Sequence, residues 1–454
     1  MEKPKTPHIL LLPYPATGHI NPMLHFAKYL ASKSIQITLI VPTQGAKSPA
    51  LANLPPSISH AVIGDDSDQP TLFNEDKTVD LETHFKRFRS VYIPNLLEFI
   101  HRQGWGRNPD ETAYPKAMVY DSTMPWLLEV AAEKGMKAAP FFTECCGVNA
   151  LCYHLNKGNV TFPYEEEFPY RLPSLPALEA GDLLYLPDKV DKRGDIVRYL
   201  AAQFELLENA DYILVNTFYH LEPEVLDWLE ERYPKQRAIG PTFLLPGIDA
   251  ETAAPQQESY SEWLDSKQPN SVIFVSFGTI VTFGGNQMEE VAHALLMSNR
   301  NFLWVVRNTE EVEKLPREIR ESEAGLIVNW CHQSRVLSHP AVSCFMTHCG
   351  WNSTLEALSI GVPIVAMPRW TDQTANAKFI EDTWRVGVRL KRGWKSDEIF
   401  GRERIAKCIE EVVNGVELRK NCLKWKALAV EAVRRGGTSI DSVEEFVREL
   451  LLIT

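Results

Sequence analysis

Long apolar runs are missing from this sequence. No stretch reaches the roughly 18 apolar residues that a membrane-spanning helix needs. The N-terminal run ILLL is short and is followed at once by Pro13 and Pro15. We therefore predict neither a membrane span nor a signal peptide.

Cysteine is also scarce. The 454 residues include 8 cysteines, of which Cys145 and Cys146 are adjacent and the others are scattered. Disulfide frameworks belong to short, cysteine-dense secreted chains. We therefore expect reduced thiols and a cytoplasmic protein.

Basic charge and two common nucleotide motifs are lacking as well. The chain has 47 Lys and Arg against 59 Asp and Glu, a net charge of −12 that argues against a partner such as nucleic acid or an anionic membrane. Neither G-x-G-x-x-G nor G-x-x-x-x-G-K-[ST] occurs, so the phosphate fingerprints of nicotinamide dehydrogenases and P-loop NTPases are absent. Any phosphate must be bound by local donors.

What the sequence does contain is an alternation of buried strands and helices, which is typical of α/β folds with parallel sheets. Its length predicts two or three domains, at about 150 residues for each. In the first half we expect strands at residues 8–13, 35–41, 117–120, 138–142 and 212–215, and helices at 22–32, 79–101 and 124–134. In the second half we expect strands at 272–276, 302–306, 326–329, 342–346 and 362–366, and helices at 352–360 and 439–452.

Residues 241–260 are rich in Pro, Ala and polar residues and have little periodicity, which is typical of a linker. The predicted architecture is therefore two Rossmann-like domains, residues 1–240 and 261–435, that face each other across a cleft. Residues 436–454 then form a C-terminal helix. In such sheets ligands gather at the carboxyl ends of the strands. The residues expected at that edge are His19, Asp121, Gly278, Thr279, Trp330, His348 and Asp372.

His19 is the candidate general base. Gly18 leaves room for a close approach, and a helix starting at Pro22 would place the imidazole near a positive dipole end, which favours the neutral form. A neutral imidazole can take a proton from a hydroxyl if a carboxylate, here Asp121, holds its other nitrogen. A loop histidine beside a capping carboxylate is the simpler alternative for either residue alone.

The run HCGWNSTLE predicts an anion site. Gly350 breaks a strand before a helix, and Ser353 with Glu356 forms a capping-box pattern that predicts the helix start. Free N–H groups there, with Asn352 and His348 alongside, suit a diphosphate. An ordinary helix cap is the alternative.

Neighbouring strand ends suit the rest of a nucleotide sugar. Trp330 could stack on a nucleobase, with Gln333 and the Cys331 backbone bonding its edge, although a lone Trp is more often a core residue. Asp372 and Gln373 suit sugar hydroxyls, although Asp372 could be only a helix cap.

Two metal-site interpretations are weak. Five residues resemble zinc ligands in composition but not in spacing: Cys331, His332, Cys344, His348 and Cys349. Asp66 and Asp68 mimic the acidic pair of metal-dependent glycosyltransferases, but their polar segment is more simply a solvated loop. We expect no metal and no other cofactor.

The segment from Trp330 to Gln373 resembles the donor-sugar signature of plant family-1 UDP-glycosyltransferases, and GHINP, DSTMPW, FFTECC and VSFGT extend the resemblance over the chain. The resemblance is closest to the subfamily that acts on small acids, thiohydroximates, terpenoids and steroids. It implies a GT-B fold and an inverting, metal-independent glucosyltransferase. The co-substrate would be UDP-glucose, and the acceptor would be a hydroxyl or carboxyl oxygen of a small hydrophobic molecule such as a terpenoid, steroid, phenolic or carboxylic acid.

The resemblance also implies roles for individual residues. His19 and Asp121 would deprotonate the acceptor, and the last helix would return to the first domain of a monomer. The implied uridine contacts are Trp330, Gln333 and Glu356. The implied diphosphate contacts are His348, Asn352 and Ser353. The implied sugar contacts are Trp351, Asp372 and Gln373, with Thr143 from the first domain. Ser276, Gly278, Thr279 and Cys331 complete the predicted donor site.

Three positions depart from the family pattern. His332 stands where Pro is usual, Arg369 where Gln is usual, and Glu144 where relatives often carry Gln. The alternative function is that of a nucleotide-sugar-binding protein or an oxidoreductase relative without transferase activity. The intact pair of His19 and Asp121 beside an intact donor segment favours the enzyme.

Overall fold

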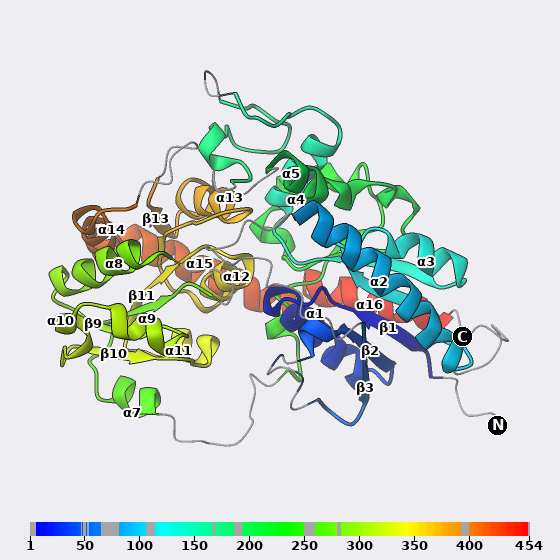
Figure 1. The fold of residues 1–454 in the computed structure, drawn as a ribbon, viewed down its shortest axis with the longest axis horizontal. Helices are drawn as coiled ribbons and strands as arrows, with labels where there is room; N and C mark the ends of the chain where they lie inside the picture. The colour runs from blue at the N-terminus through cyan, green and yellow to red at the C-terminus, as the bar shows by residue number, and fades with distance from the viewer. Residues whose placement is uncertain are drawn as a thin grey trace.

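The computed structural model describes residues 6–46, 48, 51, 54–64, 81–105, 114–165, 167, 169–185, 193–248, 259–278, 283–391 and 399–452. Thr279, Asp66 and Asp68, with residues 249–258 of the predicted linker, lie outside these ranges. The described chain forms two parallel sheets surrounded by helices, which are the right-hand and left-hand halves of Figure 1.

The first sheet has the strand order β3-β2-β1-β4-β5-β6-β7, and all its neighbours pair in parallel. Its strands are β1 (His8–Leu12), β2 (Gln36–Pro42), β3 (Ile58–Ile63), β4 (Ala117–Asp121), β5 (Lys137–Phe142), β6 (Ile213–Val215) and β7 (Gln236–Ala238). The order reverses between β1 and β4, which is where a doubly wound sheet opens a ligand-binding crevice.

The second sheet repeats this design with the order β10-β9-β8-β11-β12-β13, again parallel throughout. Its strands are β8 (Val272–Ser276), β9 (Asn301–Val305), β10 (Gly325–Val328), β11 (Val342–Thr347), β12 (Ile364–Ala366) and β13 (Gly387–Arg389). Its switch point lies between β8 and β11. The predicted fold class of two Rossmann-like domains is confirmed.

Helices cover both sheets. Those around the first sheet are α1 (Thr17–Ser32), α2 (Leu81–Arg102), α3 (Leu127–Glu133), α4 (Cys146–Asn156), α5 (Arg193–Ala201) and α6 (Pro223–Glu230). The others are α7 (Ser259–Asp265), α8 (Gly285–Met297), α9 (Thr309–Lys314), α10 (Arg317–Arg320), α11 (Gln333–Ser338), α12 (Trp351–Ile360), α13 (Gln373–Lys378), α14 (Arg402–Asn414), α15 (Val416–Val433) and α16 (Thr438–Leu452). Short turns include η1 (Thr43–Gly45), η3 (Ala180–Asp182), η4 (Ala202–Phe204), η5 (Leu207–Asn209), η6 (Tyr219–Leu221), η7 (Thr242–Leu244) and the π-helical η8 (Phe379–Thr383).

Strand β1 shows how the central strands are held. All five of its residues are buried. Leu10 belongs to the core that contains Leu96 of α2, whereas Ile9 and Leu11 face the core that contains Phe26 of α1. Burial on both faces explains why the central strands read as unbroken apolar runs.

Helix α1 begins at Thr17, so the predicted start at Pro22 is wrong and Pro22 lies inside the helix. Proline has no N–H to donate to the carbonyl four residues back, which is that of Gly18. That carbonyl instead accepts a hydrogen bond of 2.6 Å from Asn352 Nδ2 of the second domain. A gap in the helical bonding thus becomes a contact between the domains.

Helix α16 packs against the first sheet although α15, before it, packs on the second domain. Val443, Phe446 and Leu450 share the core that contains Ile9 and Leu11. In Figure 1, α15 lies in the left-hand half of the molecule and α16 lies in the right-hand half, among the elements of the first domain. The predicted return of the C-terminal helix is therefore observed.

Three strands were not predicted. They are β3, β7 and β13. The first sheet therefore continues beyond the strand predicted at residues 212–215 to β7. β7 and β13 are edge strands of three residues each, QRA and GVR, too short to show a period.

Among the described helices, none combines the length and apolarity needed to cross a membrane. All eight cysteines are buried and have free thiols.

Candidate functional site

His19 and Asp121 meet at the switch point of the first sheet. Asp121 ends β4 and is fully buried, and His19 lies in the first turn of α1. His19 Nδ1 is 2.7 Å from Asp121 Oδ2. The other carboxylate oxygen, Oδ1, accepts from the Thr123 amide at 3.0 Å and the Thr123 hydroxyl at 2.5 Å. These bonds fix the carboxylate, which in turn orients the imidazole.

The pKa of His19 is raised above 6.5 on balance. Burial lowers it, but the charge and hydrogen bond of Asp121, with smaller effects of Glu144 and Asp372, outweigh burial. The expected preference for the neutral form from the helix dipole is therefore overridden by carboxylates. The Asp121 contact assigns the proton to Nδ1, and Nε2 is then the nitrogen that could accept a proton.

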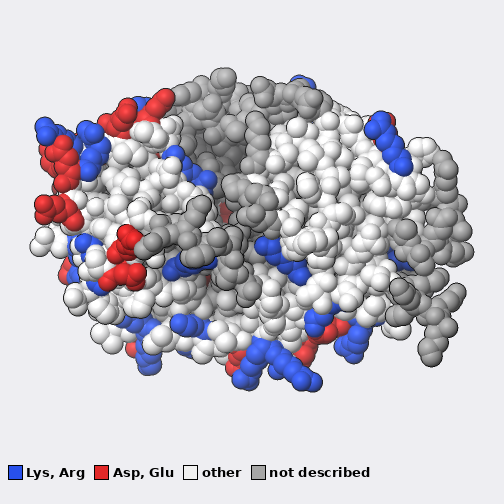
Figure 2. All heavy atoms as spheres, turned by 90° about the horizontal axis from the view of Figure 1, so that it is seen from below, with Lys and Arg blue, Asp and Glu red and all other residues white. Residues whose placement is uncertain are grey.

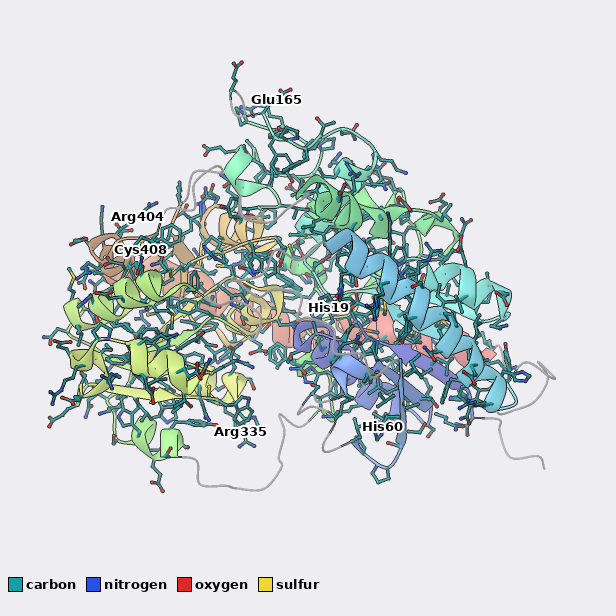
Figure 3. All side chains as sticks on the ribbon, viewed as in Figure 1. His19, His60, Glu165, Arg335, Arg404 and Cys408 are labelled. Atoms are coloured by element: carbon teal, nitrogen blue, oxygen red, sulfur yellow. The ribbon has the colours of Figure 1, made fainter. Side chains whose placement is uncertain are left out.

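The surroundings of His19 are aromatic. Figure 3 shows His19 where the two halves of the molecule meet. The Tyr14 ring packs edge-on against the imidazole with centroids 5.4 Å apart, and Phe85 stacks on Tyr199 at 3.5 Å behind it. The Thr143 hydroxyl, just past β5, lies 3.1 Å from His19 Nδ1.

His348 occupies the switch point of the second sheet, directly after β11. A Cβ on Gly278 would lie 2.6 Å from the imidazole Cε1, and one on Gly350 would lie 2.6 Å from Nε2. Gly278 also has φ +77°, which glycine adopts without strain. The ring therefore fits between two positions that exclude a side chain. Ser276, the last residue of β8, is buried beneath this loop.

The pKa of His348 is lowered to about 4 by burial and by the nearby positive charge of Arg307. His348 is therefore neutral at pH 7 and can offer an anion a hydrogen bond but no charge. Arg307, two residues past β9, was not among the predicted site residues. It follows a predicted strand directly, so the strand-end rule could have found it.

Helix α12 begins at Trp351 with Gly350 as its N-cap and has no side-chain cap. The predicted capping box is therefore wrong. The Gln333 amide instead donates to Ser353 Oγ and to Glu356 Oε2, both at 3.0 Å. The two side chains are thus joined to α11 rather than to their own helix end.

The predicted uridine residues lie together around α11. Trp330 is 43% exposed, so the core interpretation is wrong, and its ring meets that of His332 edge-on at 4.3 Å. Cys331 beside it is buried. Burial raises the pKa of Glu356 to about 7, against the lowering effect of the Gln333 hydrogen bond. The exposed indole suits a nucleobase, and the buried carboxyl, bonded to Gln333, suits a ribose hydroxyl.

Asp372 and Gln373 open α13. Asp372 occupies the N-cap position of α13, but its side chain makes no capping bond. Its carboxylate accepts from the Thr371 hydroxyl and from Asn376 Nδ2, both at 2.8 Å. Gln373 Oε1 accepts from the amides of residues 369 and 370 at 3.0 and 3.2 Å. Both side chains are thus held in place before any ligand binds.

Thr371 has φ +53°, which is unusual for a β-branched residue. Its amide donates to the Tyr185 carbonyl at 2.5 Å, and the Tyr185 amide donates back at 3.3 Å. Tyr185 belongs to the first domain. Backbone strain beside Asp372 is therefore maintained by a contact between the domains.

Trp351 differs from the other predicted sugar residues. Its indole is buried, donates to the Asn216 carbonyl of the first domain at 2.8 Å and packs near Trp384 at 5.8 Å. This side chain joins the two domains. Asn352 does the same through the Gly18 carbonyl described above.

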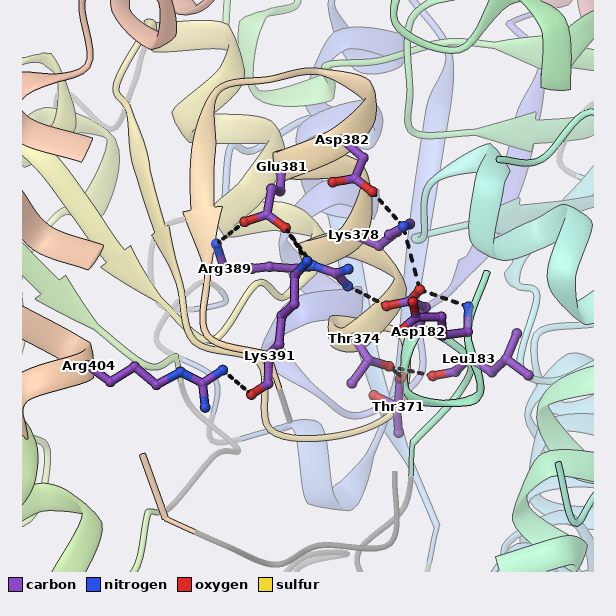
Figure 4. A network of polar contacts seen from close by, with 11 residues as sticks. Asp182, Leu183, Thr371, Thr374, Lys378, Glu381, Asp382, Arg389, Lys391 and Arg404 are labelled. Carbon is purple, nitrogen blue, oxygen red and sulfur yellow. Dashed lines mark hydrogen bonds and ion pairs between the residues drawn. The ribbon is translucent and has the colours of Figure 1, made fainter. Parts of the chain in front are cut away.

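A buried ion network also crosses the domain junction (Figure 4). Asp182 of η3 in the first domain pairs with Arg389 of β13 and lies 3.7 Å from Lys378 of α13. Arg389 also bonds Glu381 at 2.9 Å, and Lys378 pairs with Asp382 at 2.5 Å. Sequence reasoning missed this network.

The zinc candidates do not converge. Cys344 lies in the core on one face of the second sheet, and Cys331 and Cys349 lie in the core on the other. Within the described ranges no three His, Cys, Asp or Glu side chains form a potential metal site. On the face in Figure 2, acidic and basic side chains are interspersed.

Comparison with known proteins adds independent findings. A family model described as UDP-glucoronosyl and UDP-glucosyl transferase matches residues 202–431. UDP glycosyltransferase 9 of Catharanthus roseus is 42% identical and aligns with 98% of this chain and 97% of its own length. Os79 from O. sativa, solved in complex with UDP, is 31% identical with a TM-score of 0.80, covering 97% of this chain and 100% of that one. UGT2 of Phytolacca americana, solved with UDP-2fluoro-glucose and pterostilbene, is 27% identical with a TM-score of 0.81, covering 98% and 100%.

Proposed function

Because this chain belongs to the plant family-1 UDP-glycosyltransferases, and is a glycosyltransferase enzyme, we propose that it transfers glucose from UDP-glucose to an oxygen of a small hydrophobic acceptor. The observation that carries this proposal is the 2.7 Å contact between His19 and Asp121, close enough to Asp372 for its charge to act on His19. A bare binding protein has no need of a base held by a carboxylate.

The proposed reaction is a single displacement. His19 Nε2 takes the proton of the acceptor hydroxyl, and the oxygen attacks the anomeric carbon of glucose. The bond from that carbon to the UDP oxygen breaks, and UDP leaves with the electron pair. Asp121 remains ionised and stabilises the imidazolium that forms.

The donor residues would divide the nucleotide sugar between them. Trp330 would stack on the base, while Gln333 and Glu356 would bond its edge and the ribose. The N-terminus of α12 and neutral His348 would hold the diphosphate. Asp372 and Gln373 would bind sugar hydroxyls, and the fixed Oε1 of Gln373 leaves its amide nitrogen for that role. This arrangement supports a reaction without a metal ion.

The acceptor would lie beside His19. Tyr14, Phe85 and Tyr199 line that side with aromatic rings, which favours an apolar molecule with one reactive oxygen. The structure of the Phytolacca americana relative with pterostilbene supports a hydrophobic acceptor. We also propose that the protein acts in the cytoplasm and that it is a monomer. Size-exclusion chromatography with light scattering would test the monomeric state.

The test is a screen of the purified protein with UDP-glucose against hydrophobic alcohols, phenols and carboxylic acids, with UDP release and product mass as readouts. We expect at least one acceptor to gain a single hexosyl group. Tight UDP-glucose binding without transfer to any acceptor would support the alternative of a binding protein.

A further inference from the structure

Glu144 lies between two elements of the proposed site but has no role in the mechanism above. It follows Thr143, whose hydroxyl is 3.1 Å from His19 Nδ1. It precedes Cys145, whose thiol donates to Asn376 Oδ1 at 3.3 Å. Asn376 in turn donates to Asp372 Oδ2 at 2.8 Å. Glu144 is therefore placed between the candidate base and the candidate sugar residue.

One oxygen of Glu144 has no explanation in the fold. Oε2 is buried and has no hydrogen-bond partner among the described residues. The Gln203 side chain bonds the carboxyl group but is itself fixed, since its Oε1 accepts from Ser122 at 2.5 Å and its Nε2 donates to the Leu200 carbonyl at 3.0 Å. A buried polar atom without a partner costs free energy unless a ligand satisfies it.

The charges around Glu144 favour its neutral form. Burial, with the charges of Asp372 and Asp121, raises its pKa to about 8 in spite of the lowering effects of His19 and Gln203. Cys152 of α4 also faces it. At pH 7 the carboxyl group therefore carries a proton that it can donate, while the Asp372 carboxylate can only accept when ionised.

We propose that Glu144 binds the transferred sugar, with its protonated Oε2 donating to a sugar hydroxyl whose own hydrogen is donated to Asp372. One hydroxyl has one hydrogen, so it can bridge a carboxylic acid and a carboxylate but not two carboxylates. Ionised Glu144 would compete with Asp372 for that hydrogen. This inference rests on the proposed binding of UDP-glucose. A Gln side chain at position 144 would offer an amide N–H as a hydrogen-bond donor at every pH.

Calorimetric titration of UDP-glucose and of UDP between pH 7 and 9 tests this inference without requiring turnover. In the wild type, affinity for UDP-glucose relative to UDP should fall about tenfold from pH 7 to pH 9, as a single ionisation near pH 8 requires. Glu144→Gln should keep the ratio at its pH 7 value throughout. Glu144→Ala should lose about five- to tenfold at pH 7, the effect of one hydrogen bond.

Glu133→Gln on the surface of α3 is the matched control and should follow the wild type. A pH dependence that is the same in Glu144→Gln and in the wild type would overturn the inference, and so would a ratio independent of pH in both. Should Glu144→Ala fail to fold, Glu144→Gln alone still decides. Failure of the proposed function can be distinguished from failure of this inference. If the protein transfers no glucose, the acceptor screen gives no product, whatever the titrations show for Glu144.

Discussion

Among single residues, His19 has the central role in the proposed reaction, that of the general base. Its pKa is raised by Asp121, so the neutral form needed for proton abstraction is gained as the pH rises through a value above 6.5. His19→Ala should lower kcat for a hydroxyl acceptor by about 10²- to 10⁴-fold, because a positioned base is lost. UDP affinity, measured by calorimetry, should stay near that of the wild type.

The matched control for this variant is His60→Ala, which changes an exposed histidine of β3 and should leave turnover intact. A carboxylic-acid acceptor is an expected exception, since it is already ionised and needs little help from a base. Undiminished turnover of an alcohol by His19→Ala would remove His19 from the mechanism.

Asp372 and Glu356 should separate sugar recognition from nucleotide recognition. Asp372→Ala removes a charged hydrogen-bonding group worth about 1.5–3 kcal/mol, so kcat/KM for UDP-glucose should fall about tenfold to a hundredfold. Inhibition by UDP should hardly change. Glu356→Ala should weaken UDP and UDP-glucose alike, because the ribose is common to both. Equal weakening of both ligands by Asp372→Ala would show that Asp372 supports the fold rather than the sugar.

Residues that follow a buried strand could be placed from the sequence, because parallel strands end at one edge and His19, Asp121 and His348 each follow one. The partners of these residues could not. Gln333 reaches Ser353 and Glu356 from another helix, a pairing for which a capping-box pattern was mistaken. Local patterns do not encode contacts between separate elements.

Among the secondary-structure elements, helix α12 should stabilise the diphosphate charge that a metal ion balances in other enzymes. Its N-terminus follows Gly350, and neutral His348 and the Arg307 charge lie close by. These groups meet the diphosphate charge without a cation. Activity should therefore survive exhaustive EDTA treatment. A rate restored only by Mg²⁺ or Mn²⁺ would contradict this role and direct attention to Asp66 and Asp68.

The central strands were predictable because each has a short unbroken apolar run, such as ILLL in β1 and VIFV in β8, which is typical of a strand buried on both faces. The start of α1 was misjudged because Pro22 is typical of a first turn, whereas here an interdomain bond satisfies the carbonyl that proline leaves free. The short strands β7 and β13 had no pattern of their own. Their pairing depends on a sheet that must already exist.

At the scale of the whole molecule, the buried network of Asp182 and Arg389 should hold the domains together. Asp182 and Arg389 are separated by 207 positions, so no local sequence pattern could predict that they pair. Arg389→Leu leaves the buried Asp182 carboxylate with Lys378 alone, and breaking such a pair costs about 3–5 kcal/mol. We expect a lower Tm by calorimetry.

The double variant Asp182→Asn with Arg389→Leu should recover part of that loss, because no uncompensated charge remains. Lys407→Ala, in an exposed pair with Glu411 on α14, is the control and should change stability by less than about 1 kcal/mol. A Tm for Arg389→Leu equal to that of the control would show that the network contributes nothing.

The proposed single displacement also predicts the stereochemistry of the product. An oxygen that His19 activates would attack the anomeric carbon on the side opposite the leaving UDP oxygen, so the configuration at that carbon would invert. The proton NMR spectrum of a glucoside made from UDP-α-glucose tests this displacement at the reacting carbon. We expect the large anomeric coupling of a β-glucoside in the first-formed product. An α-glucoside would contradict it.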